Sequence, residues 1–120
     1  MNTNLPAPKR GEIWRVNFDP TVGSETRKRR PAVVISSDAT GHLPLKLVVP
    51  ITEWDDRFQV AIWHVRIPAS KLYGLRKESS ADTFQTRSVA LERFEERLGR
   101  LPEPLVEEIA LFPPLPVDSR

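Results

Sequence analysis

Apolar and polar residues alternate along much of the chain, as they do in half-buried β-strands. Residues 12–18 place Trp14, Val16 and Phe18 on one side and mostly polar residues on the other, and this period of two predicts a strand. Residues 32–35 are apolar at every position, which indicates a strand buried on both faces. The remaining predicted strands cover residues 45–51, 60–67 and 80–89, the last of which is largely polar.

The C-terminal third changes to a helical pattern. Residues 91–98 predict two helical turns that end at Gly99. A second, amphipathic helix is predicted because apolar residues then recur at spacings of 4, 4 and 3. The stripe consists of Leu101, Leu105, Ile109 and Phe112.

Strands followed by helices predict an α+β fold that is mainly β, built as a small barrel or a curled antiparallel sheet with a C-terminal helix. The length of 120 residues is that of one ordinary domain. We therefore expect a single domain over residues 1–120, with a flexible lead at residues 1–8 and a flexible tail at residues 113–120.

Composition narrows the chemistry and the compartment. The chain has no cysteine, which excludes disulfides, thiolate metal sites and a cysteine nucleophile. No apolar run approaches the roughly 20 residues that span a bilayer, and the N-terminus lacks the basic start and apolar stretch of a secretory signal. We expect a cytoplasmic protein that does not enter membranes.

Charge is unevenly distributed although the net charge is only +2. Residues 1–37 carry seven Lys and Arg against three acidic residues, whereas residues 91–120 carry four Arg against seven. An anionic partner at the N-terminal half would explain this bias. An uneven solvated surface explains it as well.

The most unusual segment is a basic loop over residues 23–30, in which four consecutive cations follow a Gly-Ser pair. Guanidinium groups and free backbone N–H groups bind phosphate. Arginine also stacks on bases, which favours single-stranded nucleic acid. Gly23, Ser24, Arg27 and Arg29 are therefore candidate RNA-binding residues, and a solvated charged loop is the alternative.

Two residues at strand ends could share a site. Pro31 restricts Arg30 to extended geometry, so that this arginine leaves the loop at the mouth of a buried strand. Thr52 lies just past the strand over residues 45–51. Pro50 in that strand lacks an N–H group and belongs at a strand end, an edge or a bulge. Neighbouring strand ends would bring Arg30 and Thr52 to one rim, although the spacing alone does not require it.

Other candidate residues favour structural roles. Two imidazoles can act as base and acid in RNA cleavage, but nothing in the sequence requires His42 and His64 to converge. Asp55-Asp56 lacks the ladder of oxygen ligands of a calcium loop. No HExxH, P-loop or nucleophile elbow is present. We expect no metal and no cofactor.

Five collinear blocks resemble the MazF/PemK family of toxin endoribonucleases. The blocks are RGEIW at residues 10–14, DPTVGSE at 19–25, RPAVV at 30–34, VPIT at 49–52 and QTRSV at 85–89. The resemblance covers about residues 9–112 in the order of the family. It implies a small SH3-like barrel that acts as a homodimer, cuts single-stranded RNA without a metal, and is inhibited by a cognate antitoxin. The implied products are a 2′,3′-cyclic phosphate and a 5′-hydroxyl.

The resemblance also implies roles for particular residues. Arg30 and Thr52 match the catalytic arginine and threonine of the family. Ser24 and Glu25 match loop positions that contact RNA or assist catalysis, and Glu25 is the more reasonable proton acceptor because a guanidinium is rarely neutral. The matching RNA-contacting strand holds Gln85 and Arg87. Phe84 and Ala90 replace acidic residues that are common in relatives.

Two alternatives come from other functional classes. A gyrase-poisoning toxin of similar fold would end in a Trp-Gly-Ile-like segment, whereas this chain ends with Val117, Asp118, Ser119 and Arg120. A catalytically silent SH3-like module could bind RNA or an acidic peptide without cutting. The sequence does not exclude the second alternative.

Overall fold

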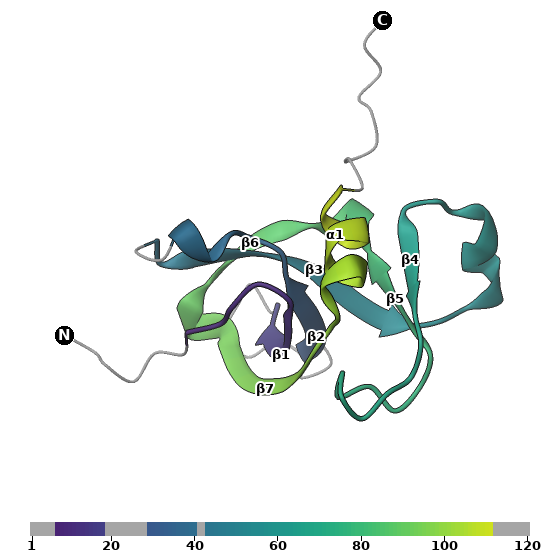
Figure 1. Ribbon diagram of the computed structural model, residues 1–120, viewed down its shortest axis with the longest axis horizontal. Helices are drawn as coiled ribbons and strands as arrows, with labels where there is room; N and C mark the ends of the chain where they lie inside the picture. Colours follow the sequence, from purple (N-terminus) through teal and green to yellow (C-terminus); the bar gives the residue numbers. More distant parts are fainter. Residues whose placement is uncertain (1–6, 19–28, 41–42, 112–120) are drawn as a thin grey trace, which may run out of the picture.

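The computed structural model describes residues 7–18, 29–40 and 43–111 (Figure 1). Within these segments the chain forms a seven-stranded antiparallel sheet followed by a helix. The elements are β1 (Glu12–Asn17), β2 (Arg29–Val34), β3 (Leu45–Glu53), β4 (His64–Ile67), β5 (Ser79–Asp82), β6 (Arg87–Ala90), β7 (Phe94–Arg100) and α1 (Glu103–Leu111). The spatial order is β4-β5-β3-β2-β1-β7, and β6 also pairs with β3. The predicted α+β, mainly β, fold is confirmed.

Strand β2 lies inside the sheet and is buried on both faces, as its apolar sequence predicts. On one face Val33 joins the larger core cluster, to which α1 contributes Val106 and Ile109. On the other face Ala32 and Val34 join a second cluster. Because both faces are packed, the middle of β2 is held firmly. This packing also determines the position of the residues that begin the strand.

The sheet curls without closing into a barrel, and one loop links its two ends. The connection from β4 to β5 reaches β7, where the backbone N–H of Arg100 donates to the carbonyl of Leu72 at 3.0 Å. Gly74 on the loop and Gly99 on β7 lie so close to the opposing backbone that neither site has room for a Cβ atom. The curled sheet that the sequence predicts is therefore stabilised by a contact between chain segments that are far apart in the sequence.

Pro50 lies inside β3, at a position where it does not interrupt the pairing. On one side of β3, residues Leu45–Val48 pair with β6 and residues Ile51–Glu53 pair with β5. Val49 and Pro50 fall between these two ladders and have no partner on that side. The missing N–H of proline is tolerated because the neighbouring strand changes there.

The predicted helix over residues 91–98 is wrong. A short 3₁₀ turn (Leu91–Arg93) precedes β7, which pairs with β1. The spacing of Leu91, Phe94 and Leu98 fits a helix, but pairing with β1 satisfies the backbone and packs the Phe94 ring edge-on against Trp14 at 5.9 Å. Tertiary pairing therefore overrides the local pattern.

The other predicted elements are recovered with changed bounds, and β2 and β3 are longer than predicted. The helix expected after Leu101 is α1, and no helix of the described segments is long and apolar enough to cross a bilayer. The predicted strand over residues 60–67 begins only at His64, because a 3₁₀ helix (Asp56–Val60) precedes it. The predicted strand over residues 80–89 is divided into β5 and β6 by a 3₁₀ turn (Thr83–Gln85).

The flexible lead predicted over residues 1–8 includes Pro8, which is fully buried, so packing begins within this range.

Glu12 is also buried, with 8% of its surface exposed, although the alternating pattern assigns it to the polar side. Its carboxylate accepts hydrogen bonds from Trp14 Nε1 and the backbone N–H of Lys9, each at 2.9 Å, and from Arg97 Nε at 3.0 Å. Burial alone would raise the pKa of Glu12, but these donors and the Arg97 charge lower it below the ordinary value of 4.5.

Replacing Glu12 by glutamine should lower the free energy of unfolding by about 1–3 kcal/mol at neutral pH, because the charge-assisted hydrogen bonds are lost. A carboxyl whose pKa is lower in the folded than in the unfolded state stabilises the fold above its unfolded pKa, and this contribution disappears as the pH falls through the folded pKa. Urea unfolding at neutral and acidic pH measures the difference. A gap between wild type and Glu12→Gln that stays constant below the ordinary glutamate pKa of 4.5 would contradict this explanation.

Candidate functional site

The start of β2 and the end of β3 form the candidate site. Ala32 lies opposite Pro50 in the antiparallel register, and the register continued by two residues brings Arg30 opposite Thr52. Residues directly opposite each other in an antiparallel pair lie on the same face. Arg30 is exposed and Thr52 is half-buried. The expectation that both residues come to one rim thus agrees with the register, while their catalytic roles stay predictions.

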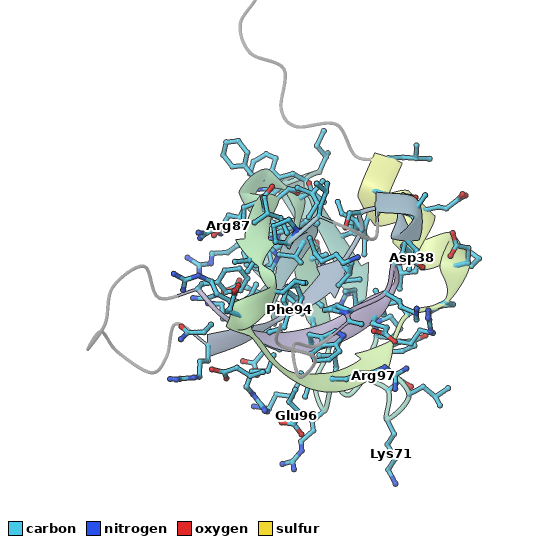
Figure 2. The ribbon with its side chains drawn as sticks, turned by 90° about the vertical axis from the view of Figure 1, so that its left-hand side faces the viewer. Asp38, Lys71, Arg87, Phe94, Glu96 and Arg97 are labelled. Atoms are coloured by element: carbon cyan, nitrogen blue, oxygen red, sulfur yellow. The ribbon has the colours of Figure 1, made fainter. Side chains whose placement is uncertain are left out.

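A pocket of about 150 Å³ brings Arg30 together with the two other predicted residues, Gln85 and Arg87. Phe18 and Pro50 complete its lining. Arg87 begins β6 and is exposed (Figure 2), and its guanidinium lies over the Phe18 ring, 5.4 Å from the centroid. Within the described segments neither Arg30 nor Arg87 forms an ion pair with a carboxylate. Two guanidinium groups are therefore available to an anionic ligand.

Gln85 is held in place by Asp82, a residue that the sequence analysis did not select. Gln85 Nε2 donates to Asp82 Oδ2 at 2.7 Å, and Asp82 Oδ1 accepts from the backbone N–H of Phe84 at 3.2 Å. The residue just before this glutamine is Phe84, and the carboxylate comes from Asp82, three positions before Gln85. An acidic residue that starts a short turn is a known capping signal and could have been noticed in the sequence.

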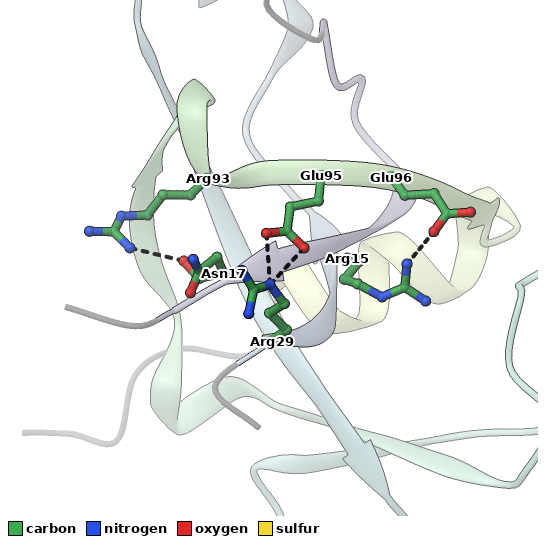
Figure 3. Close-up of polar contacts among 6 residues, drawn as sticks. All are labelled: Arg15, Asn17, Arg29, Arg93, Glu95 and Glu96. Atoms are coloured by element: carbon green, nitrogen blue, oxygen red, sulfur yellow. Dashed lines mark hydrogen bonds and ion pairs between the residues drawn. The ribbon is translucent and has the colours of Figure 1, made fainter. Parts of the chain in front are cut away.

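Arg29 does not join this pocket, because alternation along β2 directs it to the other face from Arg30. Its Nε donates to both oxygens of Glu95 on β7, at 2.9 and 3.1 Å (Figure 3). On the same strand Glu96 forms an ion pair with Arg15 of β1. The carboxylates of β7 thus neutralise cations of β1 and β2 away from the pocket.

Thr52 borders a different pocket, of about 270 Å³, which also includes Pro31, Gly74 and Lys77. Lys77 Nζ lies 3.1 Å from Glu53 Oε2 at this pocket. On the side of β3 away from β2, Thr52 lies opposite Ser80 of β5. Thr52 therefore lies between β2, which carries Arg30, and the outer strands β5 and β4.

Four predicted residues lie outside the described segments: Gly23, Ser24, Glu25 and Arg27. His42 lies outside them as well. Within residues 7–18, 29–40 and 43–111, no group of three or more His, Asp and Glu side chains could hold a metal ion.

The fold and the pocket define a small β-rich protein in which two arginines line one pocket. A sequence model of the family described as PemK-like, MazF-like toxin of type II toxin-antitoxin system matches residues 9–111. The chain belongs to this family.

Several characterised proteins are similar to this chain. Endoribonuclease MazF9 of Mycobacterium tuberculosis is 37% identical over 99 residues, which cover 78% of this chain and 81% of that protein. Endoribonuclease PemK of Escherichia coli is 31% identical over 103 residues, which cover 84% and 75%. A crystal structure of MazE-MazF from Deinococcus radiodurans superposes with a TM-score of 0.68 at 27% identity, covering 87% of this chain and 89% of that one.

Proposed function

We propose that this protein is the toxin of a type II toxin–antitoxin system and an endoribonuclease that cuts single-stranded RNA at specific sequences without a metal. Family membership and relatives named endoribonucleases support the activity. The observation that carries the proposal is the pocket in which Arg30 meets Gln85 and Arg87.

The proposed reaction is attack of the ribose 2′-oxygen on the adjacent phosphorus. The O2′–P bond forms, the P–O5′ bond breaks, and the products are a 2′,3′-cyclic phosphate and a 5′-hydroxyl. Arg30 stabilises the negative charge that grows on the phosphoryl oxygens, and Thr52 donates a further hydrogen bond. Fixed donors of this kind commonly contribute about 10²–10³ in rate each. Glu25 takes the proton of the 2′-hydroxyl in this scheme, because an arginine with a pKa above about 12 stays charged.

In this proposal the RNA chain is bound by residues of the Arg30 pocket and of the basic loop. Gln85 reads a base edge and Arg87 binds phosphate or stacks on a base beside Phe18, which its position over that ring supports. Gly23, Ser24 and Arg27 contribute from the basic loop. Arg29 would take part only after leaving Glu95, so its contribution depends on exchanging one ion pair for another.

The proposal includes a protein partner and a second copy of the chain. The Deinococcus radiodurans relative was crystallised as MazE-MazF, and the proposed partner here is a cognate antitoxin that covers the RNA site. The active form is proposed to be a cytoplasmic homodimer.

Incubation with a mixed RNA transcript in EDTA tests this function. The protein should cut RNA as fast in EDTA as without it, whereas an oligonucleotide with a 2′-deoxy sugar at the cut site should stay intact. Fragments would be mapped by sequencing their 5′-hydroxyl ends. RNA that is retarded in a gel but never cut would indicate a silent binding module, and loss of cleavage in EDTA would contradict the metal-free reaction. Inhibition of gyrase without RNA cleavage would indicate the other class of toxin.

A further inference from the structure

His64 is held in a fixed orientation on the same face of the sheet as Thr52. Its Nδ1 lies 2.7 Å from the Ser80 hydroxyl oxygen, and Ser80 is fully buried. The Phe58 ring stacks on the imidazole with a centroid distance of 3.7 Å and an interplanar angle of 4°. A hydrogen bond on one side and a parallel ring on the other leave the imidazole little freedom to rotate.

The strand register connects this histidine to the candidate site. Ser80 lies opposite Thr52 on β3 and opposite Arg66 on β4, so that one row of side chains crosses three strands. The same register continued to β2 adds Arg30. His64 comes from β4, two residues before Arg66 and on the same face, and its ring meets the row at Ser80. Ser80 therefore lies between Thr52 and the imidazole.

Charged groups surround the histidine in a defined way. Asp82 lies directly opposite His64 on β5, and its carboxylate binds Gln85 of the Arg30 pocket. Arg66 is bound by Glu78, with Nη2 to Oε1 at 3.0 Å, and its guanidinium lies 4.3 Å from the centroid of the Trp54 ring. Asp55 caps the 3₁₀ helix that contains Phe58 and is bound by Arg57, and those hydrogen bonds lower the pKa of Asp55 to about 2. Arg66 and Glu78 thus form one ion pair, and Arg57 and Asp55 form another.

The imidazole itself has one nitrogen left for chemistry. Nδ1 is engaged by Ser80, whereas Nε2 has no hydrogen-bond partner among the described residues. When both nitrogens carry protons, Nδ1 donates to the Ser80 oxygen and Nε2 can donate to a ligand. This is the arrangement in which a histidine can give up a proton from a fixed position.

We propose that His64 is a catalytic residue of this protein and protonates the leaving 5′-oxygen of the RNA, an inference that rests on the proposed function. As the O2′–P bond forms, the P–O5′ bond breaks and its electron pair goes to O5′, which takes the proton of Nε2. The proton of the 2′-hydroxyl goes to the general base, and solvent reprotonates the imidazole. Ser80 and Phe58 are positioning residues that hold the ring.

The proposal is tested with His64→Asn and two substrates under single-turnover conditions. Asparagine keeps a polar atom near the place of Nδ1 for Ser80 and removes Nε2. On ordinary RNA the rate should fall by about 10²–10⁴-fold, the range of general acid–base catalysis. On the same RNA with a bridging 5′-sulfur at the cut site, the loss should be under about tenfold, since a thiolate leaves without being protonated.

Val60→Ala is the matched control, because Val60 lies in the neighbouring 3₁₀ helix with 88% of its surface exposed and should cut both substrates at the wild-type rate. Equal losses of His64→Asn on both substrates would show a structural role and overturn the proposal. Unchanged rates on both would overturn it as well. If the wild-type protein cut neither substrate, both the proposed function and this inference would be wrong. This outcome is distinguishable from failure of the His64 proposal alone, because it is seen without any substitution.

Discussion

Arg30→Ala should cut RNA about 10²–10³-fold more slowly than the wild type, because the guanidinium is the charge assigned to the phosphoryl oxygens in the transition state. Arg30 of β2 lines the pocket that also holds Gln85 and Arg87. The other arginine of this pocket, Arg87, lies over the Phe18 ring, so it should not take over the role of Arg30. The measurement is a single-turnover rate on a chimeric oligonucleotide with one ribonucleotide at the cut site.

Arg30→Lys should recover part of this loss. Lysine keeps the charge but lacks the planar fork that matches two phosphate oxygens, so an intermediate rate is expected. Arg15→Ala is the matched control, because Arg15 is an arginine of β1 that pairs with Glu96 and lies opposite Pro31, on the other face from Arg30. A rate for Arg30→Ala close to that of Arg15→Ala would show that this site is wrong.

Gly74→Ala should lower the free energy of unfolding by about 2–5 kcal/mol, the sum of two costs. Gly74 has a φ of +74°, a left-handed conformation that costs an L-residue roughly 1–2 kcal/mol. A Cβ atom there would also lie 2.3 Å from the carbonyl oxygen of Leu98, so that the β4–β5 loop would have to leave β7. Overpacking of this kind typically costs another 1–3 kcal/mol or so.

Substitutions at two further glycines separate the cost of the left-handed conformation from the cost of overpacking. Gly99→Ala tests overpacking alone, since its Cβ would lie 2.3 Å from the Tyr73 carbonyl carbon, whereas its φ is not positive. Gly11→Ala tests the left-handed conformation alone, because φ is +91° and the nearest atoms are 3.4 Å away. Urea unfolding should rank Gly74→Ala as the most destabilised variant. If Gly74→Ala unfolded at the same urea concentration as Gly11→Ala, the loop would not be anchored on β7 as described.

Much of the candidate site could be predicted because its residues carry local signals. Pro31 marks Arg30 as a residue with restricted geometry, and the resemblance selects Gln85 and Arg87. The structure brings these three together in one pocket. Arg29 shows where local signals end, since it belongs to the same run of cations as Arg30 but pairs with Glu95 on the other face. Adjacent residues on a strand face opposite sides. Because the sequence predicts the run of cations as a loop, it does not predict that Arg29 and Arg30 lie on different faces.

Contacts between distant strands were not accessible to the sequence analysis. The sequence favours a structural role for His64, because its bond to Ser80 depends on the register of β4 with β5. The family resemblance points to the position immediately before Gln85, whereas a 3₁₀ turn brings the Asp82 carboxylate back from three positions earlier.

The sequence by itself determined which segments have an apolar side, and so it determined β1, β2, β3, the helix α1 and the two buried faces of β2. The tertiary structure alone decided that residues 94–100 are a strand, that β5 and β6 are separate, and that the β4–β5 loop lies against β7. The physical reason is that side-chain periodicity records burial along one segment. The choice between a helix and a strand for a short apolar pattern depends on whether another strand satisfies the backbone hydrogen bonds, and β1 does so for β7.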